Sequence, residues 1–280
     1  LIKRVDDRYK FFDFLFKDLT GKTKHLMESA KALINNRLDK CVSVNQIVRI
    51  YPRELFESLG FREPPKQRTL YRDLERIGKC CPVIVDKYQK LIKNNNLVSE
   101  EQFPDFSSSY FEGNKAELGA LGYSREHRPG KKQITFGIST GMNEIPTALT
   151  IQKGNVQDKK HMKSMINLLG KICDKGSVLI VDCGGNTKKN KQHIKNFNLN
   201  YLTLLPKNKN VYKKFIEKYK KSLKEIMIVN GIRYKCVKFT DGDEIKYVFH
   251  SKRLFKNLKR IRNKKFRKEL IKNKKVVRKI

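Results

Sequence analysis

Two short apolar stretches, far apart in the sequence, each carry one aspartate among residues that favour β-strands. The first is FPDFSSSYFEG, residues 103–113, with Asp105, and the second is SVLIVDCGGN, residues 177–186, with Asp182. A carboxylate at the end of an apolar strand is costly to bury unless it meets a cation. Two such strands in one α/β unit therefore predict two carboxylates that come together around a metal ion.

From residue 103 the hydrophobic periodicity indicates three strands and then an alternation of helix and strand. The first three strands can pair as an antiparallel meander, and the later strands should run parallel to the first. This order matches the ribonuclease H-like fold, in which the first and fourth strands are neighbours and Asp105 lies beside Asp182. We therefore expect an α/β fold with a ribonuclease H-like mixed sheet and flanking helices. The expected elements are strands 103–111, 133–140 and 145–154, helix 158–172, strand 177–185, helix 186–197 and strand 201–206.

Residues 1–98 are expected to form a small helical N-terminal domain, separated from the rest by the polar stretch 93–102. Its helices are short and joined by tight turns, and two further helices are expected at 64–78 and 83–94. The first of these carries Tyr71 together with basic side chains, which is typical of a helix-turn-helix-like DNA-binding unit. A helical bundle with solvated charges is the alternative.

The rest of the chain, residues 99–280, is expected to form the core domain, with a β-rich part that starts near residue 207. A charged helix at 211–225 precedes two β-rich runs around the turn Asn230–Gly231, which is a hairpin signal. A third strand is expected at 244–250. The lysine- and arginine-rich end of the chain predicts a basic helix.

The net charge of +35 over 280 residues far exceeds what solubility requires and implies a polyanionic partner. Nucleic acid fits that partner best, although ribosomal and architectural proteins share the same charge balance. The sequence has no run of 18 apolar residues, so we expect no membrane span and a cytoplasmic, nucleoid-associated protein. The six cysteines show no zinc-ligand spacing and are expected to be reduced thiols.

Residues 105–137 resemble the DDE transposases of bacterial and archaeal insertion sequences, namely the insertion-sequence-four superfamily. The segment IPTALTIQKGNVQD is similar to that family's "G-I-P … G-N-x-x-D" motif, with Gly154, Asn155 and Asp158. The segment VLIVDCGGNTKKN resembles its "V-x-D-x-G … N" motif, although Cys183 replaces a common arginine. The resemblance implies a ribonuclease H-like core with a β-strand insertion, active in metal-dependent DNA cleavage and strand transfer.

On this resemblance Asp105 and Asp182 are the first two catalytic aspartates and bind two Mg²⁺ (or Mn²⁺) ions, with Asp105 bridging both. The expected partner is double-stranded DNA, at the element ends and at the target, and a homodimer on that DNA is left open. Asp158 is better explained as a residue that starts a helix. Basic side chains near the two strands are candidates for phosphate contacts, with a solvated loop as the alternative: Arg125, Arg128, Lys131, Lys132, Lys188 and Lys189.

Such enzymes need a third carboxylate, a glutamate on a helix after the β-insertion, and residues 207–280 show no pattern for it. We therefore expect a partial, C-terminally truncated copy that is inactive by itself. Two alternatives remain: a non-catalytic nucleic-acid-binding remnant, and another ribonuclease H-like nuclease. The terminal repeats and the target site cannot be deduced from the sequence.

Overall fold

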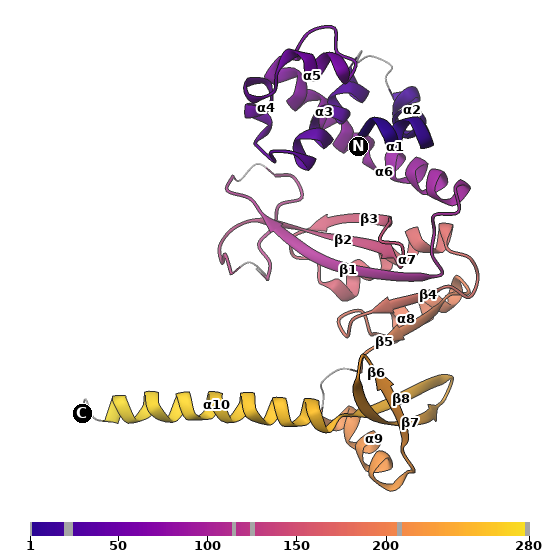
Figure 1. Ribbon diagram of the computed structural model, residues 1–280, viewed down its shortest axis with the longest axis vertical. Helices are drawn as coiled ribbons and strands as arrows, with labels where there is room; N and C mark the ends of the chain where they lie inside the picture. Colours follow the sequence, from indigo (N-terminus) through magenta and orange to yellow (C-terminus); the bar gives the residue numbers. More distant parts are fainter. Residues whose placement is uncertain (1, 20–24, 114–115, 124–126, 206–208, 278–280) are drawn as a thin grey trace. The chain divides into compact units, whose positions relative to one another are not determined.

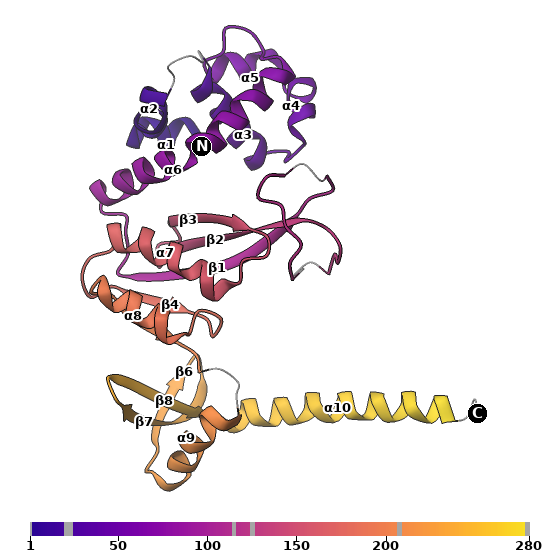
Figure 2. The ribbon, with the colours of Figure 1, turned by 180° about the vertical axis from the view of Figure 1, so that it is seen from behind.

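The computed structural model describes residues 2–19, 25–113, 116–123, 127–205 and 209–277. The chain divides into two compact units, Leu1–Leu204 and Leu205–Ile280 (Figures 1 and 2). Each unit contains its own sheet, of five strands in the first and three in the second. Among the described helices, none has both the length and the apolar character needed to cross a membrane.

The first unit is organised around a mixed sheet with the strand order β3-β2-β1-β4-β5. The meander β1–β2–β3 is antiparallel, whereas β4 runs parallel to β1 and β5 runs parallel to β4. The predicted ribonuclease H-like order is thus confirmed, including the adjacency of the first and fourth strands. The strands are β1 Glu101–Tyr110, β2 Gln133–Gly141, β3 Pro146–Lys153, β4 Val178–Val181 and β5 Asn200–Thr203.

One face of this sheet holds the main hydrophobic core. Helix α7 (Asp158–Ile172) contacts β2 and β3, and α8 (Lys188–Asn196) contacts β5; Figure 2 shows both in front of the sheet. Because strand side chains alternate between faces, Phe106 of β1 points into this core, where it packs with Met162 and Leu179. Burial of such apolar side chains supplies the main stabilisation of the unit.

The opposite face of the sheet is more open. In the strand register Asp105 pairs with Ile138, and Ile138 pairs with Leu149, so all three side chains share this face. Ile138 is 40% exposed and Leu149 is 37% exposed. Asp105 therefore stands on an exposed, partly apolar surface, on the opposite side from α7.

The N-terminal part is helical, as expected. Ser43 caps α4 through a capping box with Gln46, and Gly60 follows α5 with a φ of 103°, a conformation that favours glycine. Whether this part is a separate DNA-binding domain stays a prediction. The helices are α1 Ile2–Tyr9, α2 Phe11–Phe16, the 3₁₀ turn η1 Lys17–Leu19, α3 Leu26–Leu38, α4 Val44–Ile50, α5 Arg53–Ser58 and α6 Gln67–Asn94.

The two helices expected at 64–78 and 83–94 are a single helix, so that prediction was wrong. Helix α6 continues through Pro82. A proline inside a helix removes one backbone hydrogen bond, and its ring crowds the carbonyl four residues earlier, here that of Gly78. Leu70 near one end and Ile92 near the other are buried in separate cores and hold the helix on both sides of the proline.

The second unit is a small antiparallel sheet, ordered β6-β7-β8, with two helices. Asn230 and Gly231 have φ values of 48° and 70°, so the predicted hairpin turn is confirmed between β6 and β7. Phe215 of α9 is buried and its ring lies 6.3 Å from that of Phe239 on one face of the sheet. The elements are α9 Lys209–Lys221, β6 Glu225–Val229, β7 Ile232–Asp241, β8 Glu244–His250 and α10 Lys252–Val277.

Candidate active site

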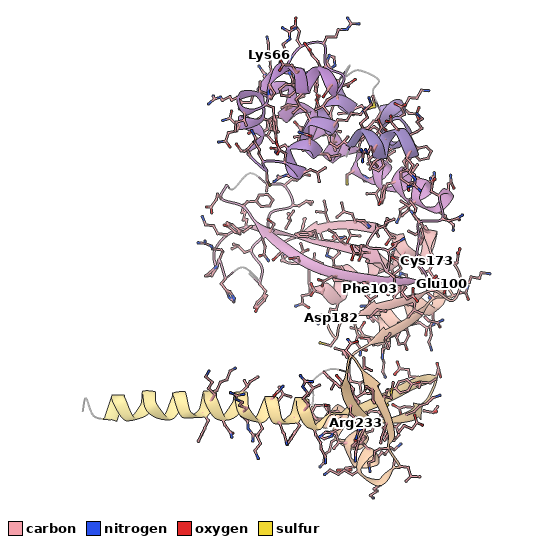
Figure 3. All side chains as sticks on the ribbon, in the orientation of Figure 1. Lys66, Glu100, Phe103, Cys173, Asp182 and Arg233 are labelled. Carbon is pink, nitrogen blue, oxygen red and sulfur yellow. The ribbon has the colours of Figure 1, made fainter. Side chains whose placement is uncertain are left out.

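The two predicted aspartates belong to neighbouring parallel strands: Asp105 lies within β1, and Asp182 directly follows β4. The register pairs Glu101 with Val178 and Gln102 with Leu179. Asp105 and Asp182 each follow the last pair by three residues, so they would lie level with each other if the same register continued. Gln102 and Leu179 are both buried on the face towards α7, which places the two aspartates on the other face. Both aspartates are exposed, and Figure 3 labels Asp182 just past the end of β4.

Backbone N–H groups hold the Asp182 carboxylate in place. Its Oδ1 accepts hydrogen bonds from the N–H groups of Gly184 at 2.9 Å and Gly185 at 3.2 Å. A Cβ on Gly184 would lie 3.1 Å from this oxygen, whereas a Cβ on Gly185 would meet nothing closer than 3.6 Å. Gly184 therefore allows the loop to close on the carboxylate. Gly184 belongs to the motif VLIVDCGGNTKKN, and the Gly-Gly pair directly after a strand-end aspartate is the sequence signal for this role.

Asp105 is held more loosely. Its Oδ1 accepts a hydrogen bond of 2.8 Å from the N–H of the next residue, Phe106. Two exposed carboxylates on one face provide the hard oxygen ligands that Mg²⁺ and Mn²⁺ prefer, so these residues fit the ions that the resemblance implies. Within the described residues no group of three or more His, Cys, Asp or Glu side chains is placed to hold a metal. In the part of the chain that the structure describes, no third carboxylate therefore completes a metal site with this pair.

The predicted basic loop between β1 and β2 is only partly free to meet a phosphate. Arg125 lies outside the described residues. The Arg128 guanidinium lies 5.8 Å above the Tyr110 ring, and Lys131 Nζ is 2.5 Å from a Glu112 carboxylate oxygen. That hydrogen bond holds the pKa of Glu112 below its usual value. Lys132 is half-buried and has a partner of its own.

Lys188 and Lys189 are placed differently. They are exposed in the first turn of α8, whose N-cap Thr187 accepts a hydrogen bond from the N–H of Asn190. Positive side chains at the positive end of a helix dipole are unfavourable without an anion nearby. These two lysines, which follow the Asp182 loop along the chain, are thus better candidates for phosphate contacts than the loop after β1.

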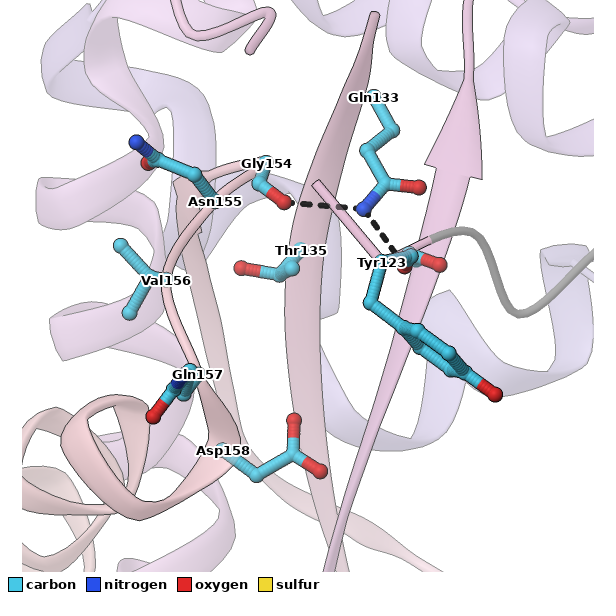
Figure 4. Close-up of a pocket in the computed structure, with 9 residues that line it drawn as sticks. Tyr123, Gln133, Thr135, Gly154, Asn155, Val156, Gln157 and Asp158 are labelled. Atoms are coloured by element: carbon cyan, nitrogen blue, oxygen red, sulfur yellow. Dashed lines mark hydrogen bonds between the residues drawn. The ribbon is translucent and has the colours of Figure 1, made fainter. Parts of the chain in front are cut away.

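A pocket of about 180 Å³ lies on the sheet face opposite to the two aspartates. Ser108 and Thr135 line it from β1 and β2, and Asp158 lines it from the first turn of α7 (Figure 4). Helix α7 begins at Asp158, as predicted, although the N-cap residue is Gln157. Neither Asp105 nor Asp182 lines this pocket, so we assign it no catalytic role.

The Gly154–Asn155 motif lines the same pocket and has a structural role there. The Gln133 amide donates 2.9 Å hydrogen bonds to the backbone oxygens of Gly154 and Tyr123 (Figure 4). A Cβ on Gly154 would lie 1.9 Å from the Gln133 backbone oxygen, so only glycine fits there. This motif therefore closes the loop between β3 and α7 against β2.

Comparison with known proteins gives one family. A family model described as "Transposase DDE domain" matches residues 105–278, more than half of the chain. The comparison with curated proteins found no match. The segment that matches the family model begins at Asp105 and also includes Asp182 and most of the second unit.

Solved structures are only distantly similar. The cryo-EM structure of the piggyBac transposase synaptic complex with hairpin DNA is 11% identical, with a TM-score of 0.38 over 80% of this chain and 50% of that chain. The Mos1 transposase paired-end complex with left transposon end is 10% identical, with a TM-score of 0.27 over 69% of this chain and 71% of that one. The chain thus spans about half the length of the first of these proteins.

Proposed function

This chain belongs to the transposase DDE domain family, and from that premise we propose that it acts in metal-dependent DNA cleavage and strand transfer during transposition of an insertion sequence. The observation that supports this proposal best is the parallel pairing of β1 with β4, because its register would bring the exposed Asp105 and Asp182 level if it continued three residues beyond the last pair, Gln102–Leu179. We further propose that the element belongs to the insertion-sequence-four superfamily, which the motifs around the two aspartates resemble.

We assign the two carboxylates the binding of two divalent ions, Mg²⁺ or Mn²⁺. When bound, the ions would supply an activated attacking oxygen and stabilisation of the leaving oxygen in phosphodiester cleavage. The chain's own contribution is to fix Asp182 through the N–H groups of Gly184 and Gly185 and to present Asp105 from a rigid strand. Preorganised ligands of this kind reduce the cost of assembling the site.

We propose that double-stranded DNA, as element end and as target, contacts the basic residues near these strands. Lys188 and Lys189 are the strongest candidates, because they are exposed at a helix N-terminus that favours anions. Arg128, Lys131 and Lys132 would join them once their present contacts are exchanged for phosphate, and Arg125 belongs to the same proposal. We also propose that the chain binds DNA in the nucleoid, and a homodimer on that DNA is compatible with the same assignment.

A second candidate function is DNA binding without catalysis. It is favoured by one observation: the described residues place no third carboxylate beside Asp105 and Asp182. In this case the chain would bind DNA through its positive charge and would not cut it. The two functions differ in whether DNA binding depends on the metal and whether the DNA is cut.

The test is Mn²⁺ binding by the purified chain, measured by water-proton relaxation, together with nicking of element-end duplex DNA. Asp105→Asn and Asp182→Asn are each expected to lower Mn²⁺ affinity about tenfold or more, because each removes one charged ligand. Asp158→Asn, on the other face of the sheet, is the matched control and should leave the affinity unchanged. Equal Mn²⁺ binding by all variants would refute the site. Mn²⁺ binding without nicking, and DNA binding that persists in EDTA, would favour the second function.

A further inference from the structure

The second unit exposes an aromatic surface that the proposed chemistry does not use. The register places Tyr234, Tyr247 and Phe249 on the same face of the β6–β7–β8 sheet, and α9 packs on the opposite face, against Phe239. Tyr247 is 49% exposed and Phe249 is 52% exposed. Their rings are stacked at 6.0 Å with an interplanar angle of 22°, and the Tyr234 ring meets Phe249 edge-on at 6.4 Å.

Apolar side chains extend this surface on both sides. Met227 of β6 pairs with Tyr234, and Ile245 of β8 follows on the same face two residues before Tyr247; both are exposed. Folding normally hides such residues, and an exposed apolar patch of this kind marks a binding surface. The sequence signal was present in EIKYVFH, where apolar residues alternate along the strand, but it predicts only a half-buried strand.

The positive charge of the second unit indicates which class of partner binds this surface. Residues 205–280 contain 27 lysines and arginines against six acids, a net charge of +21 out of +35 for the chain. Lys238 lies on the aromatic face itself, opposite Tyr247 in the register, while Glu225 is the acid at the edge of the face. Two copies of so basic a unit repel each other, whereas a polyanion is attracted.

We infer that the face formed by Tyr234, Tyr247 and Phe249, which we name the aromatic face, binds single-stranded DNA by stacking its unpaired bases. In duplex DNA the faces of the bases are covered by their neighbours, so exposed rings can stack only on unpaired bases. Aromatic rings on a basic sheet are the usual design of proteins that bind single strands without sequence preference. This inference deepens the proposed function, since it adds an unpaired strand to the duplex DNA already assigned.

The test compares binding of the full chain to a dT12 oligonucleotide and to a 20-base-pair duplex, by fluorescence anisotropy. Replacing one stacking ring by alanine is expected to weaken dT12 binding roughly tenfold, and Tyr247→Ala with Phe249→Ala roughly a hundredfold. Tyr247→Phe keeps the ring and should change the affinity by less than about threefold. Duplex affinity should stay unchanged in all three variants.

Two matched variants separate stacking from general apolar contact. Ile245→Ala removes apolar area from the aromatic face without removing a ring, and Phe14→Ala removes an exposed ring from α2 in the other unit. Both should bind dT12 like the unchanged chain. An equal loss of dT12 binding with Ile245→Ala would show that the contact is generally apolar and not stacking. A dimer that dissociates in the double variant while dT12 binding persists would show that the surface binds protein. Either result would overturn the inference.

Photocrosslinking of the unchanged chain to an oligonucleotide that contains 5-iodouracil detects direct contact between the aromatic face and the bases. Crosslinks at Tyr234, Tyr247 or Phe249 support the inference even if a variant fails to fold, and crosslinks elsewhere alone overturn it. The outcome is independent of the proposed function. Loss of Mn²⁺ binding or nicking affects only the aspartate site, whereas loss of dT12 binding with intact duplex binding affects only the aromatic face.

Discussion

Replacing Gly184 by alanine should disturb the metal site without disturbing the fold. The added Cβ would lie 3.1 Å from Oδ1 and 3.4 Å from Oδ2 of Asp182. The first distance is tighter than an ordinary carbon–oxygen contact, so the carboxylate must move by a few tenths of an ångström. That movement strains the hydrogen bonds of 2.9 Å and 3.2 Å that Oδ1 accepts from Gly184 and Gly185.

The size of the effect follows from these two bonds. A hydrogen bond to a charged group contributes about 1.5–3 kcal/mol, and partial loss of two such bonds amounts to roughly 1–1.5 kcal/mol. Mn²⁺ affinity should therefore fall about 5- to 10-fold. Gly185→Ala is the matched control, because its Cβ would meet nothing closer than 3.6 Å.

The assay is a water-proton relaxation titration with Mn²⁺ on both variants, with thermal unfolding measured in parallel. The Gly184→Ala chain should unfold at the same temperature as the unchanged chain and bind Mn²⁺ more weakly, while Gly185→Ala should bind it normally. Equal Mn²⁺ affinity in both variants would refute the reasoning, because it would mean that the Asp182 carboxylate does not bind the ion.

Three further predictions concern stability and DNA binding. Gly170→Ala should lower the free energy of unfolding by about 1–3 kcal/mol, because the added Cβ would lie 2.3 Å from the Phe197 ring. Gly78→Ala should raise it by up to about 1 kcal/mol, because the added Cβ would meet nothing within 4 Å and alanine favours the helix. Chemical denaturation measures both changes. Burial lowers the pKa of His161 below its usual value of 6.5, and the charge of Asp158 partly offsets this shift. The contribution of neutral His161 to the free energy of unfolding is therefore present above pH 6.5 and is lost as the pH falls. Denaturation of His161→Phe should show a shallower loss of stability between pH 7 and pH 5, and an unchanged slope would contradict this. Neutralising three exposed bases of α10, namely Lys259, Arg260 and Arg262, should reduce the slope of log affinity for duplex DNA against log salt concentration by about 2–3. Neutralising Arg53, Lys79 and Lys90, which already pair with acids, should change this slope little.

Much of the fold could be predicted because its signals are local. The apolar run before Asp182 and the alternation in 133–140 each indicate a strand by themselves, and the order of strands and helices then leaves one plausible sheet. The Asn230–Gly231 turn is equally local. The neighbouring positions of β1 and β4 followed from that order.

The errors arose where tertiary contacts override local signals. Gly78 and Pro82 normally end a helix, but buried residues on both sides keep α6 continuous. The basic loop after β1 was predicted as a group, yet Lys131 pairs with Glu112, which lies 19 residues away in the sequence. No periodicity reveals such a pair.

For the candidate site, too, the sequence predicts some features and misses others. The sequence identifies Asp105 and Asp182 as the exceptional residues of their strands, but it does not show that Gly184 and Gly185 donate hydrogen bonds to one of them. The aromatic face escaped prediction because a strand with exposed rings has the same pattern as a strand with buried ones.

The most direct test of the central claim is anomalous diffraction from crystals of this chain grown with Mn²⁺. The account predicts a manganese peak within bonding distance of carboxylate oxygens from both Asp105 and Asp182. A peak bound to only one of them, or carboxylates that point to different sides of the sheet, would contradict it.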